Sequence, residues 1–220
     1  MMIKGILFDM DGVLFDTERL ALQADDAVAA EMGYTLSDTL KNSLMGLGEA
    51  EVRRLFYEEL GPDFDYDTFL RRVLETIMHW IETRGLPKKP GVDALLAWAR
   101  AQGYQLAVAS STRAPMVHKL LARAGIDGYF SAVVGGDMVP DAKPAPDIFL
   151  AAAKALNLAP GQCLAVEDSH HGVCSAAAAG CVTVMVPDIL APTPEIESMC
   201  AAVHASLEDI PAFLADYSGD

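Results

Sequence analysis

Four carboxylates lie within ten residues near the start of the chain, in the stretch IKGILFDMDGVLFDTE. Asp9 and Asp11 directly follow an apolar run at 6–8, and Asp16 and Glu18 come soon after them. Buried like charges cost several kcal/mol unless a partner neutralises them. This cluster therefore calls for a cationic partner at the end of what the sequence indicates is a buried strand.

Polar residues follow three later apolar runs in the same way. These residues are Ser110, Ser111 and Thr112 after 104–110, Asp137 and then Lys143 after 130–136, and Glu167 and Asp168 at the end of 162–168. In an open parallel sheet, ligands bind at the carboxyl ends of the strands. We therefore expect these residues to meet in one pocket, although they are far apart in the sequence.

The residue types in this pocket suit phosphoryl chemistry. Carboxylates from two strand ends form a hard oxygen site, which suits Mg²⁺ better than a soft metal. Hydroxyls and N–H groups near Ser110 and Ser111, at a helix start, suit a phosphate, and Lys143 adds a positive charge. Asp9 is then a candidate nucleophile toward phosphorus, and Asp11 a candidate acid and base.

Strands that alternate with helices must position these residues. The sequence predicts strands at 6–8, 104–110, 130–136, 162–168 and 181–187, and helices at 113–125, 145–158 and 171–180. This alternation indicates βαβ units and a parallel sheet, in a Rossmann-like three-layer α/β/α core. Residues 17–86 show helical patterns, so we expect a core domain at 1–16 and 87–220 with a helical insertion at 17–86.

Composition limits the classes of function. The chain has 220 residues, 52% of them hydrophobic, and a formal net charge of −15, which disfavours nucleic acid and anionic membranes as partners. No apolar run approaches the ~20 residues that span a bilayer, and the N-terminus lacks a signal-peptide pattern. The four cysteines show no C-x-x-C pairing, which argues against a zinc site. We expect a cytoplasmic monomer.

Four motifs resemble those of the haloacid dehalogenase-like phosphatases, in the family's order. They are FDMDGVLFDTE, VASST, AKPAPDIF and VEDSHHGVCSAAAAG. The chain looks most similar to the β-phosphoglucomutase-like branch of sugar-phosphate phosphatases, and its insertion at 17–86 resembles the family's helical cap domain. The resemblance implies a Mg²⁺-dependent phosphatase for a small phosphorylated metabolite, acting through an aspartyl-phosphate.

The resemblance also implies a role for each matching residue. Asp9 corresponds to the nucleophile and a Mg²⁺ ligand, and Asp11 to the acid and base, with its backbone carbonyl on the metal. The phosphate-binding residues are Ser110, the adjacent Ser111 amide and Lys143, which also steadies Asp9. Asp168 corresponds to a further Mg²⁺ ligand, with Glu167 beside it binding directly or through water.

The insertion departs from the mutase pattern of that branch. Ala21 stands where the mutase keeps a histidine, and Glu49 stands at or next to the place of an arginine that grips a second phosphate. An acid there would repel a second phosphate, so the sequence favours hydrolysis over a phosphosugar mutase. Candidate substrate contacts are Thr17, Glu18, Gly46, Glu49 and Arg113.

Several plainer interpretations remain open. Asp16, Thr17 and Glu18 also suit the start of a helix, as does Ser110, and Arg113 suits a solvated helix start. Asp137 either bonds a neighbouring motif or simply ends a strand. A non-enzymatic switch with a long-lived phosphoaspartate shares the acid cluster, the hydroxyl and the lysine. The insertion after the first strand and the presence of Asp11 argue against that switch.

Overall fold

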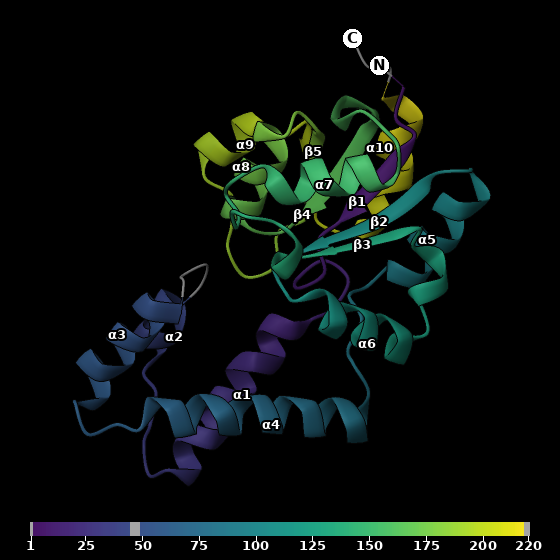
Figure 1. Cartoon of the computed structure of the whole chain (residues 1–220). Helices are drawn as coiled ribbons and strands as arrows, with labels where there is room; N and C mark the ends of the chain where they lie inside the picture. Colours follow the sequence, from purple (N-terminus) through teal and green to yellow (C-terminus); the bar gives the residue numbers. More distant parts are fainter. Residues whose placement is uncertain (1, 45–48, 218–220) are drawn as a thin grey trace. The chain divides into compact units, whose positions relative to one another are not determined.

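A computed structural model describes residues 2–44 and 49–217. The chain divides into two compact units, Met1–Asp16 with Pro87–Asp220, and Thr17–Leu86 (Figure 1). The first is an α/β unit and the second is helical throughout its described part. Among residues 2–44 and 49–217, no helix is both long and apolar enough to cross a membrane.

A six-stranded parallel sheet forms the centre of the α/β unit, with the strand order β3-β2-β1-β4-β5-β6. The strands are β1 (Gly5–Phe8), β2 (Gln105–Ser110), β3 (Ala132–Gly135), β4 (Cys163–Glu167), β5 (Val182–Met185) and β6 (Ala202–Val203). The predicted parallel sheet is confirmed. Strand β6 was not predicted, because two residues are too few to show a periodic pattern.

Helices cover both faces of this sheet. They are α5 (Val92–Ala101), α6 (Ala114–Ala124), α7 (Asp147–Ala155), α8 (His170–Ala178), α9 (Pro194–Met199) and α10 (Ile210–Asp216), with short 3₁₀ turns η1 (Asp127–Tyr129), η2 (Gly136–Met138), η3 (Pro160–Gln162) and η4 (Leu207–Asp209). Helices α5 and α6 cover one face of the sheet, and α7 and α8 cover the other, as right-handed crossovers between parallel strands require (Figure 1).

The central strand is apolar at every position because both of its faces are buried. Leu7 packs in one cluster with Phe149 of α7 and Ala165 of β4. Phe8 points to the opposite face, where its ring meets Phe130 edge to face at 6.1 Å between centroids. Burial of both faces explains why this strand reads as a continuous hydrophobic run rather than an alternating one.

The helical unit contains α1 (Thr17–Glu31), α2 (Asp38–Ser43), α3 (Glu49–Leu60) and α4 (Tyr66–Arg84). Helix α1 packs against α4, and an aromatic cluster joins the elements: Phe56 stacks on Phe64 at 5.6 Å and contacts Phe69 at 4.9 Å. A turn at 61–65 joins α3 to α4, and the Asp65 side chain accepts the Thr68 N–H at the start of α4. This unit therefore has a hydrophobic core of its own.

One acid in α1 is expected to make the stability of the helical unit depend on pH. Burial, reinforced by Asp26 and Glu18, raises the pKa of Asp25 from 3.8 to about 7. Between these values the folded chain holds a proton that the unfolded chain has released, so the Asp25 contribution to stability falls as pH rises. We predict that Asp25→Asn raises the free energy of unfolding at pH 8 by about 1–2 kcal/mol, discounted for partial exposure, and by less near pH 5.

Urea unfolding at both pH values would measure this effect. Glu82→Gln is the matched control, because this exposed acid on α4 of the same unit does not contribute to the raised pKa of Asp25, and its replacement should change the free energy of unfolding little at either pH. An equal gain from Asp25→Asn at both pH values would contradict the assignment of a raised pKa.

Candidate active site

The carboxyl ends of three adjacent strands bring the predicted site residues together. Asp9 directly follows β1, while Ser110 is the last residue of β2 and Glu167 the last residue of β4. Strand β1 pairs with both neighbours in parallel, with Phe8 opposite Val108 and Val166. The convergence of residues more than 150 positions apart therefore follows from the parallel pairing alone.

Lys143 lies at the centre of this edge. Its Nζ contacts Asp9 Oδ1 at 2.5 Å, Glu167 Oε1 at 2.6 Å and the Ala109 carbonyl oxygen at 3.1 Å. The three charged side chains are almost completely buried, with 9% of Asp9, 8% of Lys143 and none of Glu167 exposed. A lysine 134 positions from Asp9 thus provides the cationic partner that the acid cluster required.

This buried group has two acidic side chains, Asp9 and Glu167, and one basic side chain, Lys143. Burial raises the pKa of Asp9 to about 8, with Glu167 and Asp11 adding to the rise and Lys143 opposing it. Burial lowers the pKa of Lys143, but the Asp9 and Glu167 carboxylates outweigh this and hold it above its ordinary value. Lys143 is therefore a permanent cation that contacts two acidic side chains.

Glu167 is held from two sides. Its Oε1 accepts from Lys143, and its Oε2 accepts from the Asp168 N–H, the Ser169 N–H and the Ser169 hydroxyl at 3.1–3.3 Å. A Cβ at Gly172 would come within 1.9 Å of this carboxyl group, so the first turn of α8 closes directly over it. Both Glu167 oxygens therefore bond within the protein, and this side chain orients Lys143.

The loop after β1 turns back sharply and lies against Asp168. The Gly12 N–H donates to the Phe15 carbonyl at 2.8 Å, and the Leu14 N–H donates to the Met10 carbonyl at 2.9 Å. Gly12 has a φ of +80°, and a Cβ there would lie 2.2 Å from Asp168 Oδ2. Glycine at this position therefore lets the Asp168 carboxylate approach the backbone between Asp11 and the following turn.

The loop after β2 carries the predicted phosphate-binding residues. Ser110 is buried, and its Oγ accepts the Thr112 N–H at 3.1 Å, which leaves the hydroxyl hydrogen available as a donor. Ser111 is exposed. The Thr112 hydroxyl donates to Asp11 Oδ2 at 2.9 Å, so the loops after β1 and β2 are joined by a direct bond.

The start of helix α6 lies three residues after Ser111. It starts at Ala114, whose N–H donates to Asp137 Oδ1 at 2.7 Å. The Asp137 carboxylate thus accepts the first N–H of α6. Its negative charge partly neutralises the positive N-terminal end of the helix dipole. Asp137 therefore bonds the neighbouring motif rather than merely ending a strand. Arg113 is 82% exposed, with its Nε 3.9 Å from Asp137 Oδ2.

The substrate-contact candidates of the insertion fall in the helical unit. Thr17 and Glu18 form the first turn of α1. Glu49 is the first residue of α3, but its side chain lies outside the described structure, as does Gly46 altogether. Their roles stay predictions.

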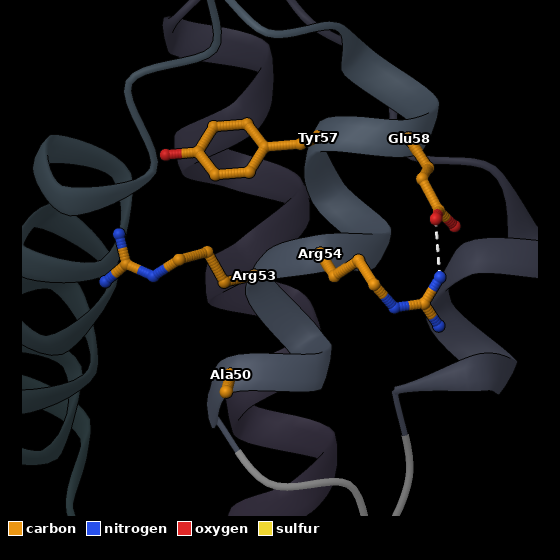
Figure 2. A pocket seen from close by; sticks show the side chains of 5 residues that line it. All are labelled: Ala50, Arg53, Arg54, Tyr57 and Glu58. Carbon is orange, nitrogen blue, oxygen red and sulfur yellow. Dashed lines mark hydrogen bonds and ion pairs between the residues drawn. The ribbon is translucent and has the colours of Figure 1, made fainter.

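The helical unit also contains a pocket of about 370 Å³ on α3, shown in Figure 2. Its lining residues are Ala50, Arg53, Arg54, Tyr57 and Glu58. Arg53 pairs with Asp67 at 2.7 Å and lies 4.5 Å from the centre of the Tyr66 ring, while Arg54 pairs with Glu51 and with Glu58. Because each arginine already faces a carboxylate, we assign no anion site to this pocket.

The carboxylates around Asp9 are suitable ligands for a hard divalent cation. Asp9, Asp11 and Asp168 offer only oxygen ligands, and a cation beside them would oppose the burial and the neighbouring acids that raise the pKa of Asp9. Among the described residues, no three His, Cys, Asp or Glu side chains are grouped closely enough to hold a metal on their own. Mg²⁺ suits such a site, because it commonly keeps several waters and takes only one or two carboxylates plus a substrate phosphate.

Thr112 and Ser169 also make contacts in the site, and the sequence motifs did not predict a role for either residue. Ser169 is the N-cap of α8 and accepts the Gly172 N–H at 3.0 Å, besides donating to Glu167. A serine just before a helical pattern is a helix-start signal, so this role was visible in the sequence. The Thr112 contact was not, because nothing in a sequence shows which hydroxyl of the second motif turns toward Asp11.

Comparison with known proteins supports the family that these motifs indicate. Residues 6–186 match the family described as haloacid dehalogenase-like hydrolase. The chain is 34% identical to the phosphorylated carbohydrates phosphatase of Thermotoga maritima, over 81% of this chain and 82% of that protein. It is 31% identical to hexitol phosphatase A of Escherichia coli, over 96% of this chain and 94% of that protein.

A solved structure shows the same fold. The crystal structure of a putative β-phosphoglucomutase from Thermotoga maritima superposes with a TM-score of 0.83 at 31% identity, and covers 97% of this chain and 99% of that one. The match extends through both the α/β unit and the helical unit in sequence. The chain belongs to the haloacid dehalogenase-like hydrolase family, in its β-phosphoglucomutase-like branch.

Proposed function

We propose that this protein is a Mg²⁺-dependent phosphomonoesterase for a small phosphorylated metabolite of the sugar-phosphate class. The observation that carries the proposal is the buried contact of Lys143 with Asp9 and Glu167 at the carboxyl end of β1. A buried acid held by a lysine, with a second acid two residues away, suits nucleophilic attack on phosphorus. The similarity to a phosphorylated carbohydrates phosphatase and a hexitol phosphatase supports the substrate class.

The proposed reaction has two steps. An Asp9 carboxylate oxygen attacks phosphorus, the bond from phosphorus to the leaving oxygen breaks, and Asp11 gives its proton to that oxygen. A water molecule then attacks the phosphorus, Asp11 takes its proton, and the bond to Asp9 breaks to release phosphate. Throughout, the Ser110 hydroxyl, the Ser111 amide and the Lys143 ammonium hold the phosphate oxygens.

The metal proposal rests on the charge of the site. Asp9, Asp168 and the Asp11 backbone carbonyl would hold Mg²⁺, while Glu167 orients Lys143. When bound, the cation supplies charge that neutralises both the carboxylates and the substrate phosphate. It would also favour the ionised Asp9 that the attack requires, against the effect of burial on the pKa of this acid.

Residues 17–86 would form the cap domain that admits the substrate. Ala21 and Glu49 are the residues of this insertion that favour hydrolysis over a mutase, because a mutase must retain a bisphosphate intermediate. An acid at position 49 would repel the second phosphate of such an intermediate.

The proposal is tested by incubating the purified protein with a panel of about a hundred phosphorylated metabolites and Mg²⁺. We expect free phosphate from sugar or polyol phosphates, a loss of at least about 100-fold with EDTA, and recovery on adding Mg²⁺. Formation of a hexose 6-phosphate from the 1-phosphate and a bisphosphate primer, without free phosphate, would instead identify a mutase. An acyl phosphate that lasts for hours after acetyl-phosphate treatment would identify a switch.

A further inference from the structure

Thr112 makes a contact that the roles assigned above do not include. Its Oγ1 lies 2.9 Å from Asp11 Oδ2, across 101 positions of sequence. Asp11 lies in the loop after β1 and Thr112 in the loop after β2, and these two strands are neighbours in the sheet. Because a threonine hydroxyl has one hydrogen and a carboxylate oxygen can only accept, Thr112 is the donor whenever Asp11 is ionised.

The backbone holds Thr112 in place from both sides. Its N–H donates to Ser110 Oγ at 3.1 Å, and its carbonyl accepts the Gly136 N–H at 3.1 Å. Ser110 in turn is buried at the end of β2. The hydroxyl of Thr112 is therefore presented to Asp11 from the same short segment that carries the proposed phosphate-binding residues.

We propose that Thr112 is a positioning residue for the acid–base step. By donating to Oδ2, it fixes the rotation of the Asp11 carboxyl group and makes Oδ1 the oxygen that passes the proton to the leaving group. It also ties this acid to the loop that binds the phosphate, so the proton donor and the phosphorus keep a constant separation. This inference rests on the proposed phosphatase function.

The test separates proton delivery from phosphate binding by varying the leaving group. An alkyl phosphate such as glucose 6-phosphate leaves as a strongly basic alkoxide and needs the proton, while p-nitrophenyl phosphate leaves as a stable phenolate and needs it little. We expect Thr112→Val to lower kcat/KM for the alkyl phosphate by about tenfold to a hundredfold, the range of a hydrogen bond to a charged group. The loss for p-nitrophenyl phosphate should stay within about threefold.

Thr112→Ser keeps the hydroxyl and is expected to retain both activities within about threefold. Valine has the same branched shape as threonine, and Thr112→Ala serves as a second variant without the hydroxyl if the valine variant does not fold. The matched control is Thr83→Val, which removes the hydroxyl that donates to the His79 carbonyl at 2.8 Å in α4.

Three results would overturn the inference. They are an equal loss for both substrates, a gain in rate without the hydroxyl, and a serine variant as impaired as the valine variant. A wild-type protein that releases no phosphate from any member of the metabolite panel would instead refute the proposed function itself, so the two failures are distinguishable.

Discussion

Asp9→Asn is expected to abolish phosphate release from every substrate that the wild-type protein hydrolyses, with kcat lower by at least about 10⁴-fold. An amide is a far weaker nucleophile than a carboxylate and cannot form the acyl phosphate. The substitution keeps the size of the side chain and leaves the second Lys143 contact, to Glu167 at 2.6 Å, in place. Because it also removes a carboxylate whose pKa burial raises, the variant should fold at least as stably as the wild type.

Steady-state release of free phosphate and urea unfolding would measure the two effects together. Asp127→Asn is the matched control, since this exposed acid in η1 of the same unit should change neither quantity. In the wild-type protein, rapid quenching followed by mass spectrometry should find a phosphoryl group on the peptide that contains Asp9. An Asp9→Asn variant with near-normal turnover would refute the proposed nucleophile.

Lys143→Met is expected to lose activity and also to destabilise the α/β unit by about 3–5 kcal/mol in the absence of a divalent cation. It leaves the buried carboxylates of Asp9 and Glu167 without the cation that contacts both of them. Stability and catalysis thus depend on the same ammonium group. Urea unfolding in EDTA would measure the first effect and phosphate release with Mg²⁺ the second.

A second substitution separates the two roles of Lys143. The double variant Lys143→Met with Glu167→Gln removes one of the stranded charges and should recover part of the stability, while activity stays lost. Lys154→Met is the control, because Lys154 is exposed on α7. A Lys143→Met variant as stable as the wild type would contradict the prediction that the Asp9 and Glu167 carboxylates need the Lys143 ammonium for stability.

The convergence of the site residues at the strand ends could be predicted from the sequence. Apolar runs at 6–8, 104–110 and 162–168 predict buried strands, and the helical patterns between them require parallel pairing. Parallel strands place their carboxyl ends at one edge of the sheet, so Asp9, Ser110 and Glu167 must meet there whatever the detailed packing. The order of the four motifs indicated the haloacid dehalogenase-like family, and the comparisons confirm it.

The partners of individual side chains could be decided only by the tertiary structure. Asp137 accepts the first N–H of α6, and both oxygens of Glu167 accept hydrogen bonds within the protein. The Thr112 hydroxyl donates to Asp11 across 101 positions. Each contact depends on where a loop directs a side chain to within about an ångström, because hydrogen bonds weaken steeply with distance and angle. Strand periodicity determines which edge a residue reaches, but loop geometry determines which atom it meets there.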